Sequence, residues 1–460
     1  MKRTFLFLTA VAFAAAIMAG CGKPAVEPKG DDPVEVDPAE LEALKLSVAV
    51  PENNWVYSGK PTFVIHAENP NKVAVKAEAK VRVATDKGKE VTIFTREVEV
   101  PANGSMDVDM AVPQELDPGF YKASCYMAGR SARIFTFGVS PDKLVSAPDK
   151  QSDFDAFWDA AKEQLAKVEM KEKLTELPSH SSASRKVYFV EMQSVPDGPG
   201  GNPVIIHGYY LEPQDGQKHP VLVHFFGYDD LKPSGKMSCP SGGSSAEYAE
   251  FYLSTRGQMI NNRTAAQRAD GVAQDFVNAY GDWFAFGFGN KDSYYYRGAF
   301  MDCVQAIRFM ATRPTSDMDN VFAEGSSQGG AFSYAAAALS DYPLRAIAPC
   351  VAFLGDFPDY FDIVQWPGNV AKSNQGSLTD AQMYAFLSYF DTKNLATRIK
   401  CAVIACSGLQ DTTCPPHTNT APFNNLTVTD KQMYYYPELG HQIPSNWPNR
   451  YMAFFKERIR

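Results

Sequence analysis

The sequence predicts an α/β domain over residues 150–460, preceded by a small all-β, immunoglobulin-like sandwich over residues 44–140. Continuous apolar segments followed by helical segments in the second half of the chain indicate a largely parallel sheet, whose strands are buried on both faces. Short segments of alternating apolar and polar residues before residue 140, separated by turn residues, are typical of a sandwich. The third observation is a glycine-rich turn, residues 325–329, between an apolar strand and an alanine-rich helix.

The composition is that of an ordinary globular protein with enough apolar material for a large core. The 460 residues are 45% hydrophobic and 21% charged, with a formal net charge of -9 at pH 7. No basic cluster occurs beyond the extreme N-terminus, so the charge pattern excludes nucleic acid as a partner.

The first 21 residues are predicted to be a lipoprotein signal peptide. Lys2 and Arg3 precede an apolar run that is too short to span a membrane comfortably and that ends in Met18-Ala-Gly-Cys21. This ending resembles a bacterial lipobox, in which the cysteine becomes the lipidated first residue of the mature protein. We therefore expect Cys21 to anchor an exported bacterial lipoprotein at the outer membrane or the cell surface. An ordinary signal peptide that happens to contain a cysteine is the alternative.

Residues 22–43 are predicted to be a disordered tether, because Pro, Glu and Asp dominate most of this segment and large apolar residues are scarce. The chain has eight cysteines, and seven remain once Cys21 is set aside. An exported compartment permits disulfides, and an odd number leaves at least one cysteine without a partner in the chain. No spacing resembles a metal site, and we expect neither a metal nor a cofactor.

The alternating pattern of the predicted sandwich is clearest at residues 76–83 and 90–100. We expect this module to be a spacer or packing domain, because its architecture hosts many unrelated roles. Carbohydrate binding is the alternative, and exposed aromatic side chains would be its sign. Trp55 and Tyr57 are the two aromatic residues that stand out.

The α/β domain follows a linker at residues 141–150. Its first helix is expected to open with a capping box from Ser152 to Asp155. Residues 356–373 are expected to be irregular. The remaining pattern predicts strands at residues 186–192, 203–211, 220–228, 249–254, 345–352, 401–406 and 432–437, and helices at residues 299–312, 380–390 and 447–459.

The glycine-rich turn has the G-x-S-x-G pattern of a nucleophile elbow, with Ser327 at its centre. A strained turn lifts the serine oxygen clear of the backbone, and Gly325 and Gly329 leave room where strand and helix nearly collide. The helix that follows directs its free N–H groups and the positive end of its dipole toward an oxyanion formed there. A glycine-rich turn without chemistry is the alternative.

A serine at such a turn needs a base, and the base needs an orienting carboxylate. Asp411 follows the strand predicted at residues 401–406, and His441 follows the strand predicted at residues 432–437. The carboxyl ends of parallel strands meet at one edge of the sheet, so Asp411 and His441 are expected beside Ser327.

Other acids and bases compete for these two roles. Asp356, Asp359 and Asp362 follow an earlier strand and could supply the acid, but no histidine is near them in the sequence. His417 lies close to Asp411 and could supply the base, but the two prolines before it indicate the start of a helix. The other five histidines are expected to be structural or exposed.

An oxyanion hole is expected from two backbone N–H groups. One belongs to Gln328, directly after the nucleophile, and the other to Tyr228, in the turn Phe226-Gly-Tyr228 at the end of an earlier strand.

These residues, together with Arg256-Gly-Gln258, Asp292-Ser-Tyr-Tyr-Tyr-Arg-Gly298 and Gly440-His-Gln442, resemble the acetyl xylan esterase / cephalosporin C deacetylase family, carbohydrate esterase family 7. The resemblance covers about residues 152–460. It implies an α/β-hydrolase fold, no metal, and removal of acetyl groups from acetylated xylo-oligosaccharides and similar small alcohol esters.

The same resemblance implies roles for single residues. It assigns Ser327, Asp411 and His441 to the catalytic triad and Tyr228 and Gln328 to the oxyanion hole. It makes Arg256 and Gln258 structural support behind the site, since a guanidinium fork suits holding two loops together.

The chain departs from the family pattern in two places. Phe226 stands where the family usually has His, and Gln442 stands where it usually has Glu, so no full charge follows His441 to pair with Arg256. The family tends to form rings, which leaves a homo-oligomer open here. Two other functions remain open as well: hydrolysis of other esters or peptides, and glycan binding by a surface lipoprotein without turnover.

Overall fold

The computed structural model describes residues 38–49, 51, 54–228, 239–240, 246–258 and 280–460. The predicted signal peptide, its Cys21 and most of the predicted tether lie outside the described residues, so they stay predictions. Residues 38–43, expected to continue the disordered tether, instead form helix α1 (Pro38–Ala43). The Arg130 guanidinium donates hydrogen bonds to the carbonyls of Leu41, Glu42 and Leu44, which holds this helix end on the sandwich. None of the described helices is long and apolar enough to cross a membrane.

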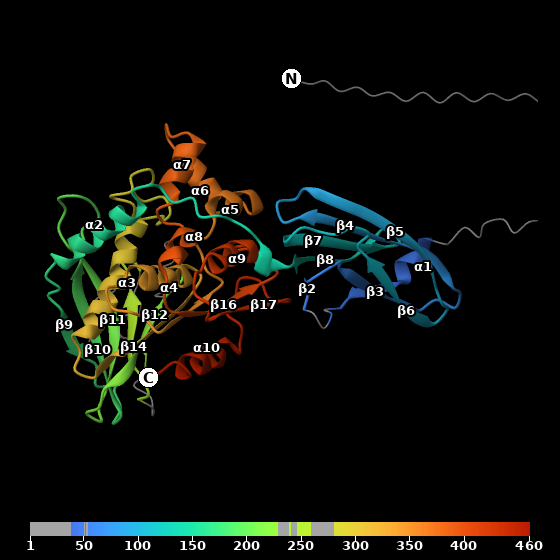
Figure 1. Ribbon diagram of the computed structural model, residues 1–460. Helices are drawn as coiled ribbons and strands as arrows, with labels where there is room; N and C mark the ends of the chain where they lie inside the picture. The colour runs from blue at the N-terminus through green and yellow to red at the C-terminus, as the bar shows by residue number, and fades with distance from the viewer. Residues whose placement is uncertain (1–37, 50, 52–53, 229–238, 241–245, 259–279) are drawn as a thin grey trace, which may run out of the picture.

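The N-terminal module is a β-sandwich, as predicted. A three-stranded sheet with the order β1–β3–β6 faces a five-stranded sheet with the order β2–β8–β7–β4–β5, and one apolar cluster fills the space between them (Figure 1). Alternate side chains of β4 are buried, which follows from the period of two in its sequence. The strands are β1 (Lys45–Val48), β2 (Val56–Tyr57), β3 (Thr62–Asn69), β4 (Val75–Thr85), β5 (Glu90–Val100), β6 (Gly104–Ala111), β7 (Gly119–Met127) and β8 (Arg130–Val139).

The two aromatic residues that stood out in the sandwich sequence are buried. Trp55 is 1% exposed and stacks on Phe135 with ring centroids 4.1 Å apart, and Tyr57 is 8% exposed. Both rings therefore belong to the core of the sandwich, and they do not supply the exposed aromatic surface that carbohydrate binding required.

The second domain has a nine-stranded sheet with the order β17–β16–β15–β14–β12–β13–β11–β10–β9. The six strands from β17 to β13 run parallel, and β11, β10 and β9 add an antiparallel edge, so the predicted largely parallel sheet is confirmed. The strands are β9 (Lys173–Glu176), β10 (Arg185–Ser194), β11 (Val204–Pro213), β12 (His219–Phe225), β13 (Ala249–Ser254), β14 (Ser316–Ser326), β15 (Ala346–Cys350), β16 (Ala402–Gly408) and β17 (Lys431–Tyr436).

Helices cover both faces of this sheet (Figure 1). The larger apolar cluster holds one face against α2, α3 and α4, and a smaller cluster holds the other face against α10. The helices are α2 (Phe154–Ala166), α3 (Tyr295–Ala311), α4 (Gln328–Leu339), α5 (Phe357–Ile363), α6 (Gly368–Asn374), α7 (Asp380–Leu387), α8 (Thr392–Leu395), α9 (Pro416–Asn424) and α10 (Trp447–Lys456).

Two local predictions in this domain are wrong. Helix α2 has Asp153 at its N-cap position and no side-chain cap, because the Asp153 carboxylate accepts hydrogen bonds from Lys291 and Tyr389 instead. Residues 356–373 contain helices α5 and α6. The start of α5 is held by a distant group: the Asp391 carboxylate accepts the N–H groups of Asp356 and Phe357 at 2.8 and 3.0 Å.

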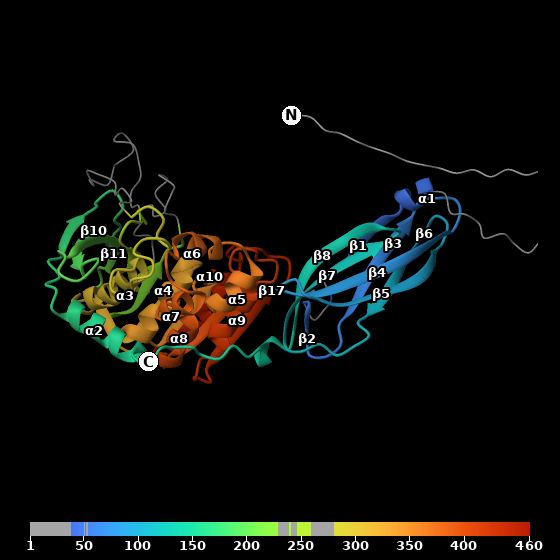
Figure 2. The same cartoon turned by 90° about the horizontal axis from the view of Figure 1, so that it is seen from above.

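The sandwich lies beyond the β17 edge of the large sheet, so the two domains are arranged end to end (Figure 2). Leu409 and Ala421 of the second domain belong to the apolar core of the sandwich. The two domains therefore share part of one core.

Candidate active site

Ser327 sits in the strained turn that the sequence predicted. Strand β14 ends at Ser326, Ser327 has φ 56° and ψ -121°, and α4 begins at Gln328. Such a conformation costs a non-glycine residue about 1–3 kcal/mol. The flanking glycines are required by space: a Cβ at Gly325 would lie 2.4 Å from the Gly329 carbonyl carbon, and one at Gly329 would lie 2.2 Å from the Phe225 oxygen.

The structure brings Ser327, His441 and Asp411 together in one hydrogen-bonded chain. His441 Nε2 lies 3.0 Å from Ser327 Oγ, and His441 Nδ1 lies 2.8 Å from Asp411 Oδ2. Asp411 is 4% exposed, whereas the His441 side chain is 27% exposed and reachable from solvent. This arrangement suits a base that takes the serine proton while a buried carboxylate orients its ring.

Asp411 is held in place by the backbone of its own loop. Its Oδ1 accepts the N–H groups of Thr413 and Cys414, both at 2.8 Å, which leaves Oδ2 for His441. The Cys414 thiol belongs to this loop, and burial raises its pKa well above the ordinary value. It therefore stays a neutral thiol rather than a competing nucleophile.

The two predicted oxyanion donors come from the ends of neighbouring strands. Gln328 is the first residue of α4, so its N–H has no carbonyl one turn earlier to bind. Its side chain is fully buried and accepts a hydrogen bond from the Tyr296 hydroxyl at 2.9 Å. Tyr228 follows strand β12, and its hydroxyl donates to Asp282 Oδ1 at 2.8 Å.

Gln258 holds the turn that carries Tyr228. Its Nε2 lies 3.4 Å from the Phe226 oxygen and 3.2 Å from the Gly227 oxygen, and its Oε1 accepts the Thr255 N–H. The structure thus places Gln258 where a support residue is needed.

Arg256 is buried and bound by acids that the sequence reasoning missed. Its guanidinium donates to Asp302 at 2.9 and 2.7 Å and to Asp197 at 2.8 Å. Burial alone would lower the Arg256 pKa, but the nearby carboxylates outweigh it and raise that pKa above its usual value. Gln442, by contrast, is exposed. The charge partners of Arg256 are Asp302 in α3 and Asp197 after β10, and not a residue beside His441.

The sequence carries only a weak indication that Asp302 pairs with Arg256. Gly298 lies one turn before it in α3, and a Cβ at Gly298 would lie 2.1 Å from the Arg256 guanidinium. A glycine and an acid four residues apart on a helix indicate room for a cation, but they do not say which one.

An aromatic cluster adjoins the serine. Tyr228 lies 5.1 Å from Trp283 and 5.5 Å from Trp366, measured between ring centroids, and Trp366 stacks on Phe353 at 4.9 Å. The Phe353 N–H donates to the Ser327 carbonyl at 2.9 Å, which ties this cluster to the elbow. A largely buried cluster of aromatic rings therefore lies beside the nucleophile.

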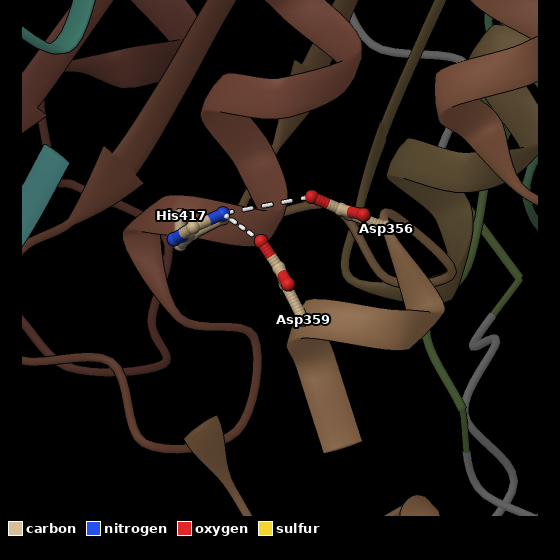
Figure 3. A group of neighbouring side chains, drawn as sticks. All are labelled: Asp356, Asp359 and His417. Carbon is tan, nitrogen blue, oxygen red and sulfur yellow. Dashed lines mark ion pairs between the residues drawn. The ribbon is translucent and has the colours of Figure 1, made fainter. Parts of the chain in front are cut away.

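Two of the three rival acids, Asp356 and Asp359, meet the rival base instead of Ser327, and the third, Asp362, lies 3.7 Å from Lys87 Nζ. Figure 3 shows His417 Nε2 facing Asp359 and Asp356, at 2.9 and 3.5 Å. Its Nδ1 lies 2.7 Å from Asp86 Oδ2 of the sandwich. Burial would lower the His417 pKa, but hydrogen bonds to Asp356, Asp359 and Asp86 outweigh it and raise that pKa to about 11. His417 is therefore a charged interdomain contact rather than a base for Ser327.

Asp356, Asp359 and His417 also form the one group in the described part of the chain whose possible ligand atoms lie close enough together for a metal ion, within 4.8 Å of one another. Lys393 Nζ lies 2.9 Å from Asp356 Oδ1, and Lys87 contacts Asp359. These ammonium groups already bring positive charge to the carboxylates that a divalent ion would use.

Comparisons with known proteins point to one family. The family model "Acetyl xylan esterase (AXE1)" matches residues 142–459. Acetyl esterase Axe7A from Xylanibacter ruminicola is 24% identical over 393 residues, which is 83% of each chain. The acetyl xylan esterase structure from Paenibacillus sp. R4 is 27% identical with a TM-score of 0.56, covering 69% of this chain and 98% of its own. Acetyl xylan esterase 1 from Thermoanaerobacterium sp. JW/SL YS485 is 26% identical with the same TM-score, covering 70% and 98%.

Proposed function

The chain belongs to the acetyl xylan esterase family of carboxylic ester hydrolases, and from this premise we propose that it removes acetyl groups from acetylated xylo-oligosaccharides or similar carbohydrate esters. The observation that carries the proposal is the hydrogen-bonded chain from Asp411 through His441 to Ser327. The names of the relatives support acetyl esters as the substrate class.

The proposed reaction is a two-step acyl transfer. His441 Nε2 takes the proton of Ser327 Oγ while that oxygen attacks the acetyl carbonyl, and Asp411 stabilises the imidazolium. The N–H groups of Gln328 and Tyr228 hold the oxyanion, and each donor of this kind is worth roughly two to three orders of magnitude in rate. The sugar hydroxyl leaves with the proton from His441. Water, deprotonated by His441, then attacks the acyl-enzyme. The bond between the acyl carbon and Ser327 Oγ breaks, His441 returns the proton to that oxygen, and acetate is released.

The test is acetate release from acetylated xylo-oligosaccharides, measured beside a series of nitrophenyl esters from acetyl to octanoyl. We expect activity on acetyl esters that falls with acyl length. We expect Ser327→Ala to lower kcat/KM by roughly 10⁴-fold or more. The matched control is Ser326→Ala, which removes the neighbouring hydroxyl at the end of β14 and should leave kcat/KM within a few-fold of wild type.

Each other result would point elsewhere. Turnover of long or aromatic esters alone, lost in Ser327→Ala, would keep the nucleophile and overturn the acetyl ester as substrate. Turnover of peptides alone would make the protein a peptidase. Binding of glycans with no Ser327-dependent turnover would replace the esterase by a binding protein.

A further inference from the structure

We propose that the β-sandwich holds Asp411 and His441 in their catalytic positions. Gln410 is the positioning residue that joins the sandwich to the loops of these two residues. This inference rests on the proposed function, because it concerns the geometry of the same triad. It replaces the expectation of a spacer by a defined role for the domain.

Gln410 binds three segments at once. Its Nε2 donates to the Thr136 carbonyl of strand β8 at 3.1 Å and to the Pro437 carbonyl at 2.8 Å, while its Oε1 accepts the Thr136 N–H at 2.9 Å. Gln410 directly precedes Asp411, and Pro437 begins the turn that leads to His441. One side-chain amide therefore links the sandwich, the loop of the acid and the loop of the base.

The edge of strand β8 presents a backbone N–H and a carbonyl that fit this side-chain amide. The N–H groups of Gly138 and Ser140 donate to the carbonyls of Trp55, directly before β2, and Tyr57, at the end of β2. Alternate residues of a strand present their backbone groups to the same edge, so the Thr136 N–H is the next one in that row, two residues before the point where β2 begins to pair with β8. The Gln410 amide satisfies both backbone groups of Thr136 and continues the ladder as a side chain.

A second contact joins the same strand to the base loop. Arg133 of β8 pairs with Glu438, the residue after Pro437. Its guanidinium lies over the Trp55 ring at 4.6 Å and donates to the Val48 carbonyl at 3.2 Å, so it is anchored in the sandwich. Strand β8 thus holds the His441 loop directly at Glu438 and, through Gln410, at the neighbouring Pro437.

The acid loop is fixed from its other side by burial. Leu409, next to Gln410, is 1% exposed and lies in the sandwich core. The Gln410 N–H also donates to the Leu439 carbonyl at 2.9 Å, so the acid and base loops touch through their backbones. Thr136 and Arg133 lie outside the family match at residues 142–459, so these ties are not part of the matched family region.

The test uses the full-length protein with two substitutions at one position. Gln410→Ala removes all three hydrogen bonds. Gln410→Glu keeps the shape but turns a carboxylate toward the Thr136 and Pro437 carbonyls. The matched control is Asn424→Ala, because the Asn424 amide also ties the second domain to the chain that comes from the sandwich, donating to the Pro141 and Leu144 carbonyls of the linker at 2.9 Å each, but touches neither triad loop.

We expect both Gln410 variants to lower kcat for nitrophenyl acetate by roughly 10- to 100-fold, with KM within about twofold, since displaced catalytic groups slow the chemistry without removing a substrate contact. We also expect the downfield proton NMR signal of the His441 Nδ1–H bound to Asp411 to broaden or disappear. Asn424→Ala should lose comparable thermal stability and keep both kcat and this signal.

Three outcomes would overturn the inference. The first is a wild-type kcat and NMR signal in the Gln410 variants, and the second is an equal loss of kcat in Asn424→Ala. The third is a Gln410 variant in which KM rises while kcat stays at the wild-type value. If Gln410→Ala does not fold, Glu438→Gln is the milder variant, for which we expect a several-fold loss of kcat; an unchanged kcat there would count against the proposal. A wild-type protein without esterase turnover would refute the proposed function, and the NMR signal alone would then decide the positioning role.

Discussion

At the scale of single residues, the triad geometry depends on groups that never meet the substrate. Asp411 presents one oxygen to His441 because two backbone N–H groups occupy the other. The Ser327 backbone tolerates a positive φ because glycines on both sides let strand and helix approach. A strained backbone of this kind persists only where many surrounding contacts hold it in place, as is common at active sites.

Replacing Asp411 by Asn tests this arrangement. Asn can still accept the Thr413 and Cys414 N–H groups, but its NH₂ then faces His441 and imposes the wrong tautomer. We expect Asp411→Asn to lower kcat for nitrophenyl acetate on the order of 10⁴-fold at neutral pH. The rival acid provides the control: Asp359→Asn should keep kcat within a few-fold. A large loss in Asp359→Asn and a small one in Asp411→Asn would reverse the assignment.

At the scale of elements, three adjacent strands carry a buried charged group. His224 of β12 lies 2.7 Å from Glu324 of β14 and 3.4 Å from Glu250 of β13, and Arg185 of β10 also pairs with Glu250. Burial would lower the His224 pKa, but hydrogen bonds and charge from Glu250 and Glu324 outweigh it and raise that pKa to about 9. The parallel pairing of β12 with β14 and β13 therefore places two carboxylates against His224, and they keep this buried histidine protonated.

This group makes stability depend on pH. Because the folded pKa of His224 exceeds the unfolded value of about 6.5, its contribution is complete below pH 6.5 and is lost as the pH rises to about 9. We expect the difference in unfolding free energy between wild type and His224→Gln to shrink across this window, by up to about 1.4 kcal/mol per pH unit. Urea unfolding at several pH values measures it, and His417 contributes equally to both proteins. A difference that stays constant would contradict the prediction.

At the scale of the whole molecule, the two domains are joined by a mixed interface. Phe120 of the sandwich lies 6.4 Å from His417 and 5.8 Å from Tyr435, measured between ring centroids. Leu409 and Ala421 complete the sandwich core from the other domain. An interface with a shared apolar core couples the unfolding of two domains more strongly than exposed ion pairs do.

We therefore expect wild type to unfold in a single calorimetric transition. Phe120→Ala should cost about 3–5 kcal/mol and separate the transition in two, with the sandwich melting first. Ile93→Ala removes an apolar side chain that is 45% exposed in the same sandwich and should leave one transition near the wild-type temperature. Two transitions in wild type would show that the domains unfold independently.

The predictions from sequence succeeded where the signal was local. The elbow at Ser327 and the start of α9 after the prolines before His417 follow from neighbouring residues. Predictions failed where a distant partner decided the outcome. Ser152 has the pattern of a cap, but Lys291 and Tyr389 bind the Asp153 carboxylate at the start of α2, and Asp391 starts α5 from outside its own segment.

The sequence by itself determined the order of the reacting groups, because the turn at Ser327 and the strand ends before Asp411 and His441 are written in short, contiguous patterns. Only the tertiary structure decided which distant residues hold the reacting groups in position. Gln410 and Thr136 are 274 positions apart, and Arg256 and Asp302 are 46 apart. The physical reason is that a hydrogen bond requires only proximity and direction. A glutamine or an aspartate carries no mark of its partner until folding brings the two together.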